Sequence, residues 1–201
     1  IDEKTGVMKR DTGSAKMNPY DLYAIETALR IKEELIDVQT TAITMGPPQS
    51  EAVLREAYML GIDHGILLTD RKFGGADCLA TAYTLSQAIL KIGLPDLIIC
   101  GKQASDGDTA QVGPGISTHL NIPQVTYVKK IEETSDKKLR IERMLEEGYE
   151  VIEAPLPLLL TVVKEINEPR IPSLKGLMRA KSAKITLLTQ KQLNLDPQQI
   201  G

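Results

Sequence analysis

The chain has 201 residues, of which 42% are hydrophobic, and its 24 basic and 27 acidic residues give a formal net charge of −3. This length and composition fit one globular domain with a well-filled core. The nearly balanced charge provides no global field that would attract nucleic acid or an anionic membrane. Any anionic ligand must therefore be captured locally.

The two cysteines, Cys78 and Cys100, occur without a CxxC spacing or a histidine cluster, so no metal site is expected. No apolar run approaches the ~20 residues that cross a bilayer, and no segment resembles a cleaved signal peptide. We expect a cytoplasmic protein that neither binds nucleic acid nor inserts into a membrane. The opening IDEKTGVMKRDTG is expected to be a linker or hairpin, and the end lacks a final helix, which together indicate a fragment.

From Asn18 the sequence alternates between helical and strand patterns. The stretch that begins NPYDLYAIETALRIKEEL predicts a helix with Asn18 as N-cap and Pro19 in the first turn. Its apolar residues at helical spacing are Leu22, Ile25, Leu29 and Ile36. Further predicted elements are a strand TTAITM, a helix SEAVLREAYML ended by Gly61, a strand GILLT, a helix CLATAYTLSQAILKI closed by Gly93, and a strand LIIC.

Strands that are apolar throughout and alternate with helices indicate a parallel sheet covered on both faces. The predicted fold class is therefore α/β, with a doubly wound, mainly parallel sheet. Beyond Ile122 the strand-like segments QVTYVKKIEE, KLRIERML, YEVIEAPLP and LLLTVVKEI follow one another without helices, which predicts an antiparallel extension at one sheet edge. We expect a single domain over residues 1–184 and the start of a C-terminal arm over 185–201.

Three loops, over residues 45–48, 70–77 and 101–115, lie where ligands bind in such folds, at the carboxyl ends of strands. The third, GKQASDGDTAQVGPG, combines glycines that permit close backbone approach with the first amides of the next helix, which can bind a phosphate. Alternatively, the loop is a simple connection in which Asp106 or Asp108 caps the helix. If a nucleotide binds, we expect both carboxylates to face helix amides, ribose hydroxyls or water.

The sequence contains neither GxGxxG nor the P-loop pattern. Its only histidines, His64 and His119, have no evident Ser or Cys partner, and we expect both to be structural or solvent-facing. No catalytic residue is predicted. The chain has the features of a binding and positioning module.

The segment GKQASDGDTAQVGP, together with NPYD near the start and NEPRIPSLKGLMRAK later, resembles the β subunit of electron transfer flavoproteins from about Gly6 to Gly201. The resemblance implies a Rossmann-like, adenine nucleotide α hydrolase-like fold and a heterodimer with an FAD-carrying α subunit. It also implies an extra strand before this chain starts and an arm that reaches the α partner. The β subunit itself would bind AMP or a second FAD.

Carried over position by position, the resemblance implies two groups of cofactor contacts. The first group is Asn18, Pro19, Tyr20, Asp21, Met45, Gly46, Gly101, Lys102, Gln103, Ala104, Ser105, Asp106, Gly107, Asp108, Thr109, Ala110, Gln111 and Val112. The loop TDRKFGGADCLAT resembles that of electron-bifurcating members, which implies FAD and adds Asp70, Phe73, Gly74, Gly75 and Asp77. Cys78 departs from the family pattern, which has threonine there. The alternative for this loop is a turn in which Asp77 caps the helix.

The stretch RIPSLKGLMR resembles the family's recognition loop for partner dehydrogenases, in which a leucine, here Leu174, anchors in a pocket on the partner. The implied contacts are Arg170, Pro172, Leu174, Lys175, Met178 and Arg179. On chemistry alone, the alternative is an ordinary surface loop with Leu174 turned inward.

The resemblance to bifurcating members implies that NADH reduces the FAD held by this subunit. One electron would pass to ferredoxin, and the other would pass through the α-subunit FAD to a flavin dehydrogenase of the acyl-CoA or 2-hydroxyacid type. An alternative within the family is an AMP-binding β subunit of a simple electron shuttle. An alternative of another class is an adenine-nucleotide-binding regulatory protein with the same architecture.

Overall fold

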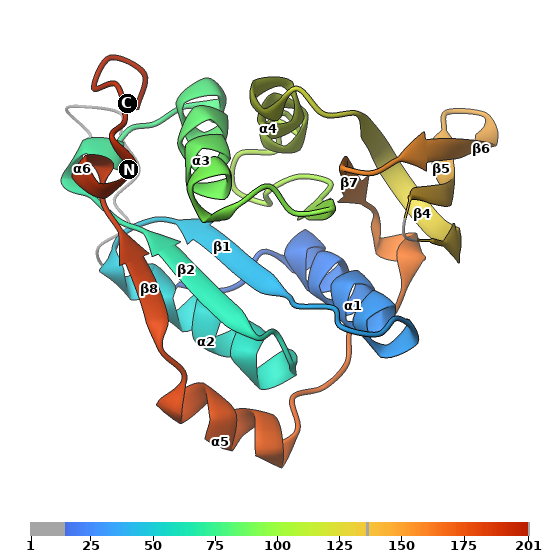
Figure 1. Ribbon diagram of the computed structural model, residues 1–201, viewed down its shortest axis with the longest axis horizontal. Helices are drawn as coiled ribbons and strands as arrows, with labels where there is room; N and C mark the ends of the chain where they lie inside the picture. The colour runs from blue at the N-terminus through green and yellow to red at the C-terminus, as the bar shows by residue number, and fades with distance from the viewer. Residues whose placement is uncertain (1–14, 136, 201) are drawn as a thin grey trace.

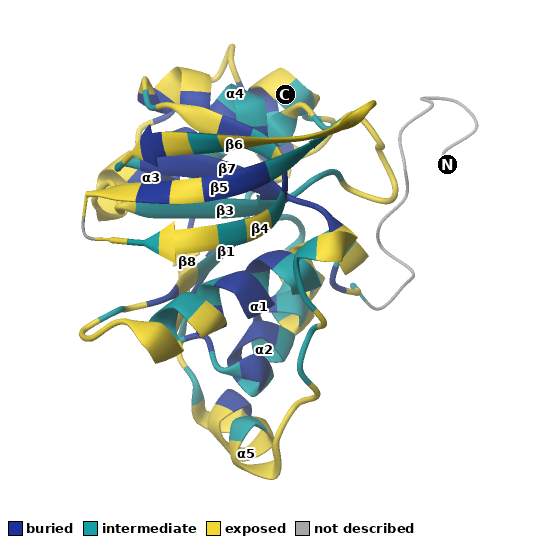
Figure 2. Cartoon of the chain, turned by 90° about the vertical axis from the view of Figure 1, so that its right-hand side faces the viewer, coloured by how far each residue is buried: buried dark blue, intermediate teal, exposed yellow. Residues whose placement is uncertain are grey.

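The computed structural model describes residues 15–135 and 137–200 and shows an α/β fold in three layers. The strands form the middle layer, with α1 and α2 on one side and α3 and α4 on the other (Figures 1 and 2). The linker or hairpin expected for IDEKTGVMKRDTG lies outside the described residues. Within those residues, no helix is both long and apolar enough to cross a membrane.

The helices and strands follow the predicted order up to residue 162, whereas the two helices and the strand beyond that point were not predicted. The helices are α1 (Pro19–Glu34), α2 (Glu51–Leu60), α3 (Cys78–Ile92), α4 (Val112–Leu120), α5 (Leu174–Ser182) and α6 (Gln190–Leu193), with 3-10 turns η1 (Pro48–Ser50), η2 (Arg71–Phe73) and η3 (Lys164–Ile166). The strands are β1 (Thr41–Met45), β2 (His64–Leu68), β3 (Leu97–Gly101), β4 (Gln124–Thr134), β5 (Lys138–Leu145), β6 (Gly148–Pro155), β7 (Leu158–Val162) and β8 (Ile185–Leu188).

Local signals explain most helix boundaries. Pro19 occupies the first turn of α1, and Gly61, with φ of 133°, ends α2 as predicted. The end of α1 was predicted wrongly at Ile36. The helix stops at Glu34 because Leu35 adopts an extended conformation, and Ile36 is 90% exposed instead of continuing the apolar face.

The described strands form two sheets, not the one continuous sheet that the sequence predicted. The first has the order β1-β2-β8, with all pairs parallel. Its third strand, β8, comes from residues that we expected at the start of a C-terminal arm. The second sheet has the order β3-β7-β4-β5-β6. The mainly parallel α/β class is nevertheless confirmed.

The antiparallel extension exists, but one predicted member belongs elsewhere. Strands β4, β5 and β6 pair antiparallel, whereas β7 lies between β3 and β4 and runs parallel to both. The prediction for β7 was therefore wrong. Every residue of β7 is buried, because the strand is covered on both faces, and uninterrupted apolar runs are typical of such strands.

Alternate side chains of β7 build the cores on the two faces of its sheet. Leu158 and Leu160 pack in a cluster that includes Ala24 of α1. Leu159 points the other way and packs in a cluster with Ile89 of α3 and Ile116 of α4. This central strand thus fixes α1 on one face and the α3–α4 pair on the other.

Asp63, just before β2, links three elements and gives a first testable prediction. Its carboxylate accepts hydrogen bonds from the Thr40 amide at 3.0 Å and from Lys32 Nζ of α1 at 2.6 Å. Burial raises the pKa of Asp63, but the hydrogen bonds from Lys32 and Thr40 outweigh burial and hold it below its ordinary value of 3.8. The ionised form is therefore favoured in the folded chain.

We expect Asp63→Asn to lower the free energy of unfolding by about 1–2 kcal/mol at pH 7. Because a lowered carboxyl pKa stabilises the fold above the unfolded-state value, this contribution is lost as pH falls through the folded-state pKa. Urea unfolding at pH 7, 5, 4 and 3 should show the two proteins converging below pH 4. Exposed Glu34→Gln is the control, and a gap independent of pH would contradict the prediction.

Candidate nucleotide site

Hydrogen bonds join the start of α1 to the loop that follows β3. We call this contact, made by Asn18 and Asp21, the clasp. Asn18 Nδ2 donates to the carbonyl of Gln103 at 2.8 Å, and the Ser105 amide donates to Asn18 Oδ1 at 3.1 Å. Asn18 occupies the predicted N-cap position, but its side chain makes no capping bond, because it is directed to the loop. The NPYD motif and the loop 101–112 are therefore in direct contact, through residues that lie 85 positions apart in the sequence.

Gly101, the last residue of β3, permits the closest approach in this region. Its amide donates to Asp21 Oδ1 at 3.0 Å. A Cβ atom at Gly101 would lie 2.6 Å from Asp21 Oδ1 and 2.7 Å from the backbone carbon of Tyr20. The loop can therefore dock on the first turn of α1 only with glycine at this position.

Two groups at this contact have raised pKa values. Desolvation raises the pKa of Asp21, although its surface stays partly open to solvent, and hydrogen bonds from Gly101 and Asn18 oppose this shift in part. Burial, reinforced by the Asp21 charge, raises the pKa of the Cys100 thiol to about 12. Cys100 is thus a protonated thiol that packs against the core.

The loop itself has a tightly turned backbone. Asp108 and Ala110 adopt positive φ angles of 50° and 55°, and the Asp108 amide donates to the carbonyl of Ala104 at 2.9 Å. The Asp108 carboxylate accepts a hydrogen bond from the Gln103 side chain instead of capping a helix. The alternative in which Asp106 or Asp108 is the N-cap of α4 is wrong, because that position is occupied by Gln111.

The chemistry of this loop suits an anionic group. Gln111 makes no side-chain capping bond, and the first amides of an α-helix have no partner within the helix. The positive end of the α4 dipole also favours negative charge there. Thr109 is exposed beside these amides and adds a hydroxyl donor. Lys102 is directed elsewhere, with its ammonium 5.3 Å from the centre of the Tyr127 ring.

The loop after β2 reaches the same region through the start of α3. Asp77 caps α3 by accepting from the Ala80 amide at 2.9 Å, as one of the alternatives predicted. The next residue, Cys78, places its Sγ 3.1 Å from Thr109 Oγ1. Cys78 thus joins the beginning of α3 to the loop 101–112.

Other residues of this second loop have structural roles. Asp70 caps η2 by accepting from the Lys72 amide at 3.1 Å and also accepts from the Gln190 amide at 3.2 Å. Phe73 was expected to face the cofactor, but the structure buries it to 7% exposure in the core. It packs there in a cluster that contains Leu188, Leu193, Leu195 and Ile200. The C-terminal residues thus cover the ring.

The remaining predicted contacts lie at loop ends. Gly75 has a φ of 85° and open space around its Cα, whereas Gly74 follows η2 closely. Met45 ends β1 and packs partly against the core, and the Gly46 amide donates to the carbonyl of Leu68 at 3.0 Å. These positions belong to the β1 and β2 loops at the carboxyl ends of parallel strands.

The stretch expected to be a recognition loop forms an exposed helix, α5, preceded by an irregular segment. Ser173 caps α5 by accepting from the Gly176 amide at 3.0 Å. Leu174 is 76% exposed, so the alternative with this side chain turned inward is wrong. Met178, Pro172 and Lys175 are also exposed.

The two arginines of this stretch are engaged within the chain. Arg179 donates to the carbonyl of Ile62 and lies 6.0 Å from the ring of Tyr58. Arg170 binds Glu26 and Glu33 of α1, an arrangement that the sequence analysis missed. The apolar residues of the stretch are therefore free to meet a partner, while its arginines hold the stretch in place.

An α/β fold that brings glycine-containing loops and an uncapped helix start to the carboxyl ends of parallel strands is typical of nucleotide-binding proteins. The electron transfer flavoprotein domain matches residues 5–193 of the chain. The chain belongs to the electron transfer flavoprotein family.

Similarity to individual relatives extends over most of the chain. The chain is 50% identical over 202 residues to the electron transfer flavoprotein subunit beta of Thermoanaerobacterium thermosaccharolyticum. This match covers 100% of the chain and 76% of the relative. The chain is 47% identical over 201 residues to the caffeyl-CoA reductase-Etf complex subunit CarD of Acetobacterium woodii, with the same coverages. The acryloyl-CoA reductase electron transfer subunit gamma of Anaerotignum propionicum is 45% identical over 195 residues, which cover 96% of this chain and 72% of the relative.

Proposed function

We propose that this chain is a β subunit that binds FAD and, together with an α subunit, divides electrons from NADH between ferredoxin and a partner flavin dehydrogenase. The observation that carries the proposal is the clasp of Asn18 and Asp21 to the loop 101–112, beside the uncapped start of α4. Two relatives named as subunits of reductase complexes support a role in such a complex.

In the proposed site, the amides at the start of α4 and the Thr109 hydroxyl hold the diphosphate of the cofactor. The Asn18 clasp fixes the loop before the cofactor binds, which lowers the ordering cost of binding. When bound, a flavin supplies hydride acceptance and one-electron transfer, which no side chain of this protein can provide. The chain contributes orientation, exclusion of water and electrostatic tuning.

FAD is favoured over AMP by the loop between β2 and α3. Its Gly75 leaves open space near the start of α3, and Cys78 brings that helix start next to Thr109. A ligand longer than AMP can therefore contact both helix starts, α3 and α4, at once. The ring of Phe73 is not among the contacts that we propose for the cofactor, because it packs in the core.

The decisive experiment is a count of cofactors in the purified αβ heterodimer. We expect two FAD molecules per heterodimer, measured by acid extraction, absorbance and mass spectrometry. One FAD with one AMP would replace the proposal with the simple electron shuttle. ATP or AMP affinity of this chain without an α partner, with no flavin in any preparation, would support a regulatory protein, which the family assignment disfavours.

A further inference from the structure

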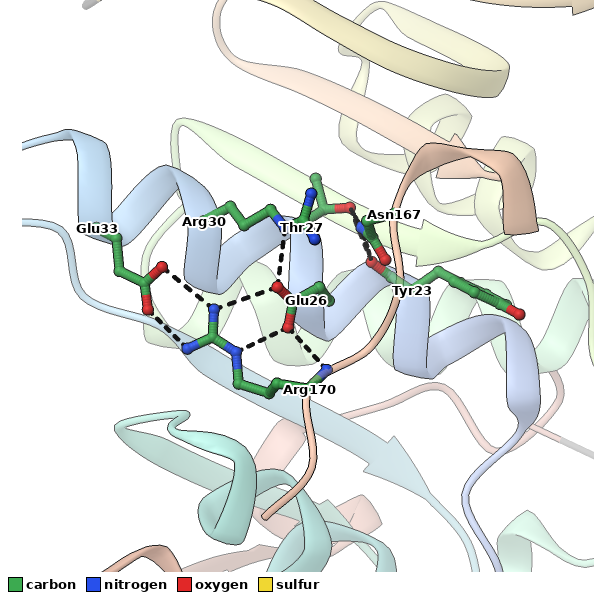
Figure 3. Close-up of polar contacts among 7 residues, drawn as sticks. All are labelled: Tyr23, Glu26, Thr27, Arg30, Glu33, Asn167 and Arg170. Carbon is green, nitrogen blue, oxygen red and sulfur yellow. Dashed lines mark hydrogen bonds and ion pairs between the residues drawn. The ribbon is translucent and has the colours of Figure 1, made fainter. Parts of the chain in front are cut away.

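The segment that leads into α5 is tied to α1 at two points. Residues 167–173 connect η3 to α5 without regular structure. At the first point, Asn167 Nδ2 donates to the carbonyl of Tyr23 at 3.1 Å and to Thr27 Oγ1 at 2.8 Å. At the second point, three residues later, Arg170 contacts two glutamates of the same helix (Figure 3).

Arg170 uses its backbone and all sides of its guanidinium in this contact. Its Nε donates to Glu26 Oε2 at 2.7 Å, and its own amide reaches the same oxygen at 3.2 Å. Its Nη1 donates to Glu33 Oε1 at 2.6 Å, and its Nη2 donates to Glu26 Oε1 and Glu33 Oε2, both at 3.2 Å. A planar, multidentate contact of this kind fixes direction as well as distance.

Glu26 is a buried carboxylate and depends on these donors. It is only 4% exposed, and Arg30 Nε supplies its remaining donor at 2.8 Å. Burial opposes its ionisation, but the hydrogen bonds from Arg170 and Arg30 outweigh burial and lower its pKa. Removing Arg170 alone would leave a buried charge with one partner, whereas removing both charges would not.

Exposed apolar residues follow Arg170 directly in the sequence. Ile171, the residue after Arg170, is 89% exposed, and Leu174 and Met178 follow at helical spacing on α5. With its guanidinium bound to Glu26 and Glu33, Arg170 is not available to a partner protein. The direction of the chain at Arg170 decides where Ile171 and Leu174 point.

We propose that Arg170 is a positioning residue for dehydrogenase docking, which holds Ile171 and Leu174 outward through its bridge to Glu26 and Glu33, and that Ile171 is part of the docking surface. The proposal rests on the proposed function, because it assumes that the partner flavin dehydrogenase docks at α5. It assigns the arginine to preorganisation of the surface, and it assigns binding to the apolar residues.

Two variants of the αβ heterodimer separate positioning from mere stability. Arg170→Met removes the bridge and leaves Glu26 buried, so both the melting temperature and docking should suffer. Adding Glu26→Gln removes the stranded charge, so the melting temperature should recover in part while the bridge stays absent. Arg140→Met, which breaks an exposed ion pair with Glu132 on the β4–β5 extension, is the matched control.

We expect the KM for the dehydrogenase to rise about tenfold in both Arg170→Met and the double variant, with kcat unchanged. Hydrogen exchange of the isolated heterodimer should be faster in residues 171–177 in both variants, and Arg170→Lys should restore part of each property. A KM that recovers together with the melting temperature in the double variant would overturn the proposal. So would unchanged exchange in residues 171–177.

Failure of this inference can be told apart from failure of the proposed function. If Leu174→Ala raises KM but the Arg170 variants do not, docking at α5 stands and the positioning role is wrong. If Leu174→Ala has no effect, docking at α5 is wrong and the docking role assigned to Arg170 falls with it. Exchange in residues 171–177 then shows only whether the bridge orders the segment.

Discussion

Gly101→Ala should abolish stable cofactor retention and lower the free energy of unfolding by about 1–3 kcal/mol. The added Cβ would lie 2.6 Å from Asp21 Oδ1 and 2.7 Å from the Tyr20 backbone carbon, so the first turn of α1 and the loop must separate. Their separation breaks the Gly101–Asp21 hydrogen bond and displaces the clasp made by Asn18. Urea unfolding and the FAD content after gel filtration measure the two effects.

Gly107→Ala is the stability control for this substitution. A Cβ there meets nothing within 4 Å, and we expect a change in unfolding free energy within about 0.5 kcal/mol. If Gly101→Ala unfolds at the same urea concentration as the unmodified chain and keeps its cofactor, the close approach of α1 to the loop is not required for the site.

Leu174→Ala should impair electron delivery to the dehydrogenase without affecting the fold. The side chain is 76% exposed, so its truncation removes little buried area, and the unfolding free energy should change by less than about 0.5 kcal/mol. An apolar anchor that fills a pocket on a partner is worth about 2 kcal/mol or more, which corresponds to a KM for the dehydrogenase raised roughly thirtyfold. Steady-state kinetics with the dehydrogenase as variable substrate measure this.

Leu90→Ala is a matched control, because this leucine is also exposed, at 49%, and belongs to α3, a helix on the opposite side of the molecule from α5 (Figure 1). It should leave the KM unchanged. Equal effects of both substitutions would indicate nonspecific loss of the heterodimer, and no effect of Leu174→Ala would remove α5 from the docking surface.

Local sequence signals predicted the elements better than their arrangement. Asp77, Gly61 and the proline after Asn18 mark helix ends through contacts within a few residues, so they can be read directly from the sequence. The place of β7 depends on pairing with β3 and β4, which no local pattern encodes. Its uninterrupted apolar run indicated burial on both faces. The strand was nevertheless assigned to the antiparallel extension because it follows those strands in the sequence.

The roles of site residues could be predicted where a side chain bonds the backbone of its own segment, as Asp77 does. They could not be predicted where segments distant in the sequence decide whether a side chain is buried. Phe73 was placed near the cofactor because its loop resembles that of electron-bifurcating members, but C-terminal residues more than a hundred positions away cover it. Glu26 gave a signal that was missed. It lies four residues after Leu22 and three before Leu29, on the apolar side of α1, where an acidic residue requires a buried partner.

The position of β7 constrains the order in which the protein can assemble during translation. β3 and β4 cannot complete their sheet until residues 158–162 have left the ribosome, since β7 separates the two strands. Until then, the β4–β6 hairpins can form by themselves, but β3 lacks the only strand that it pairs with in the described sheet. Nascent chains that stall before residue 158 should therefore be the ones that require chaperones.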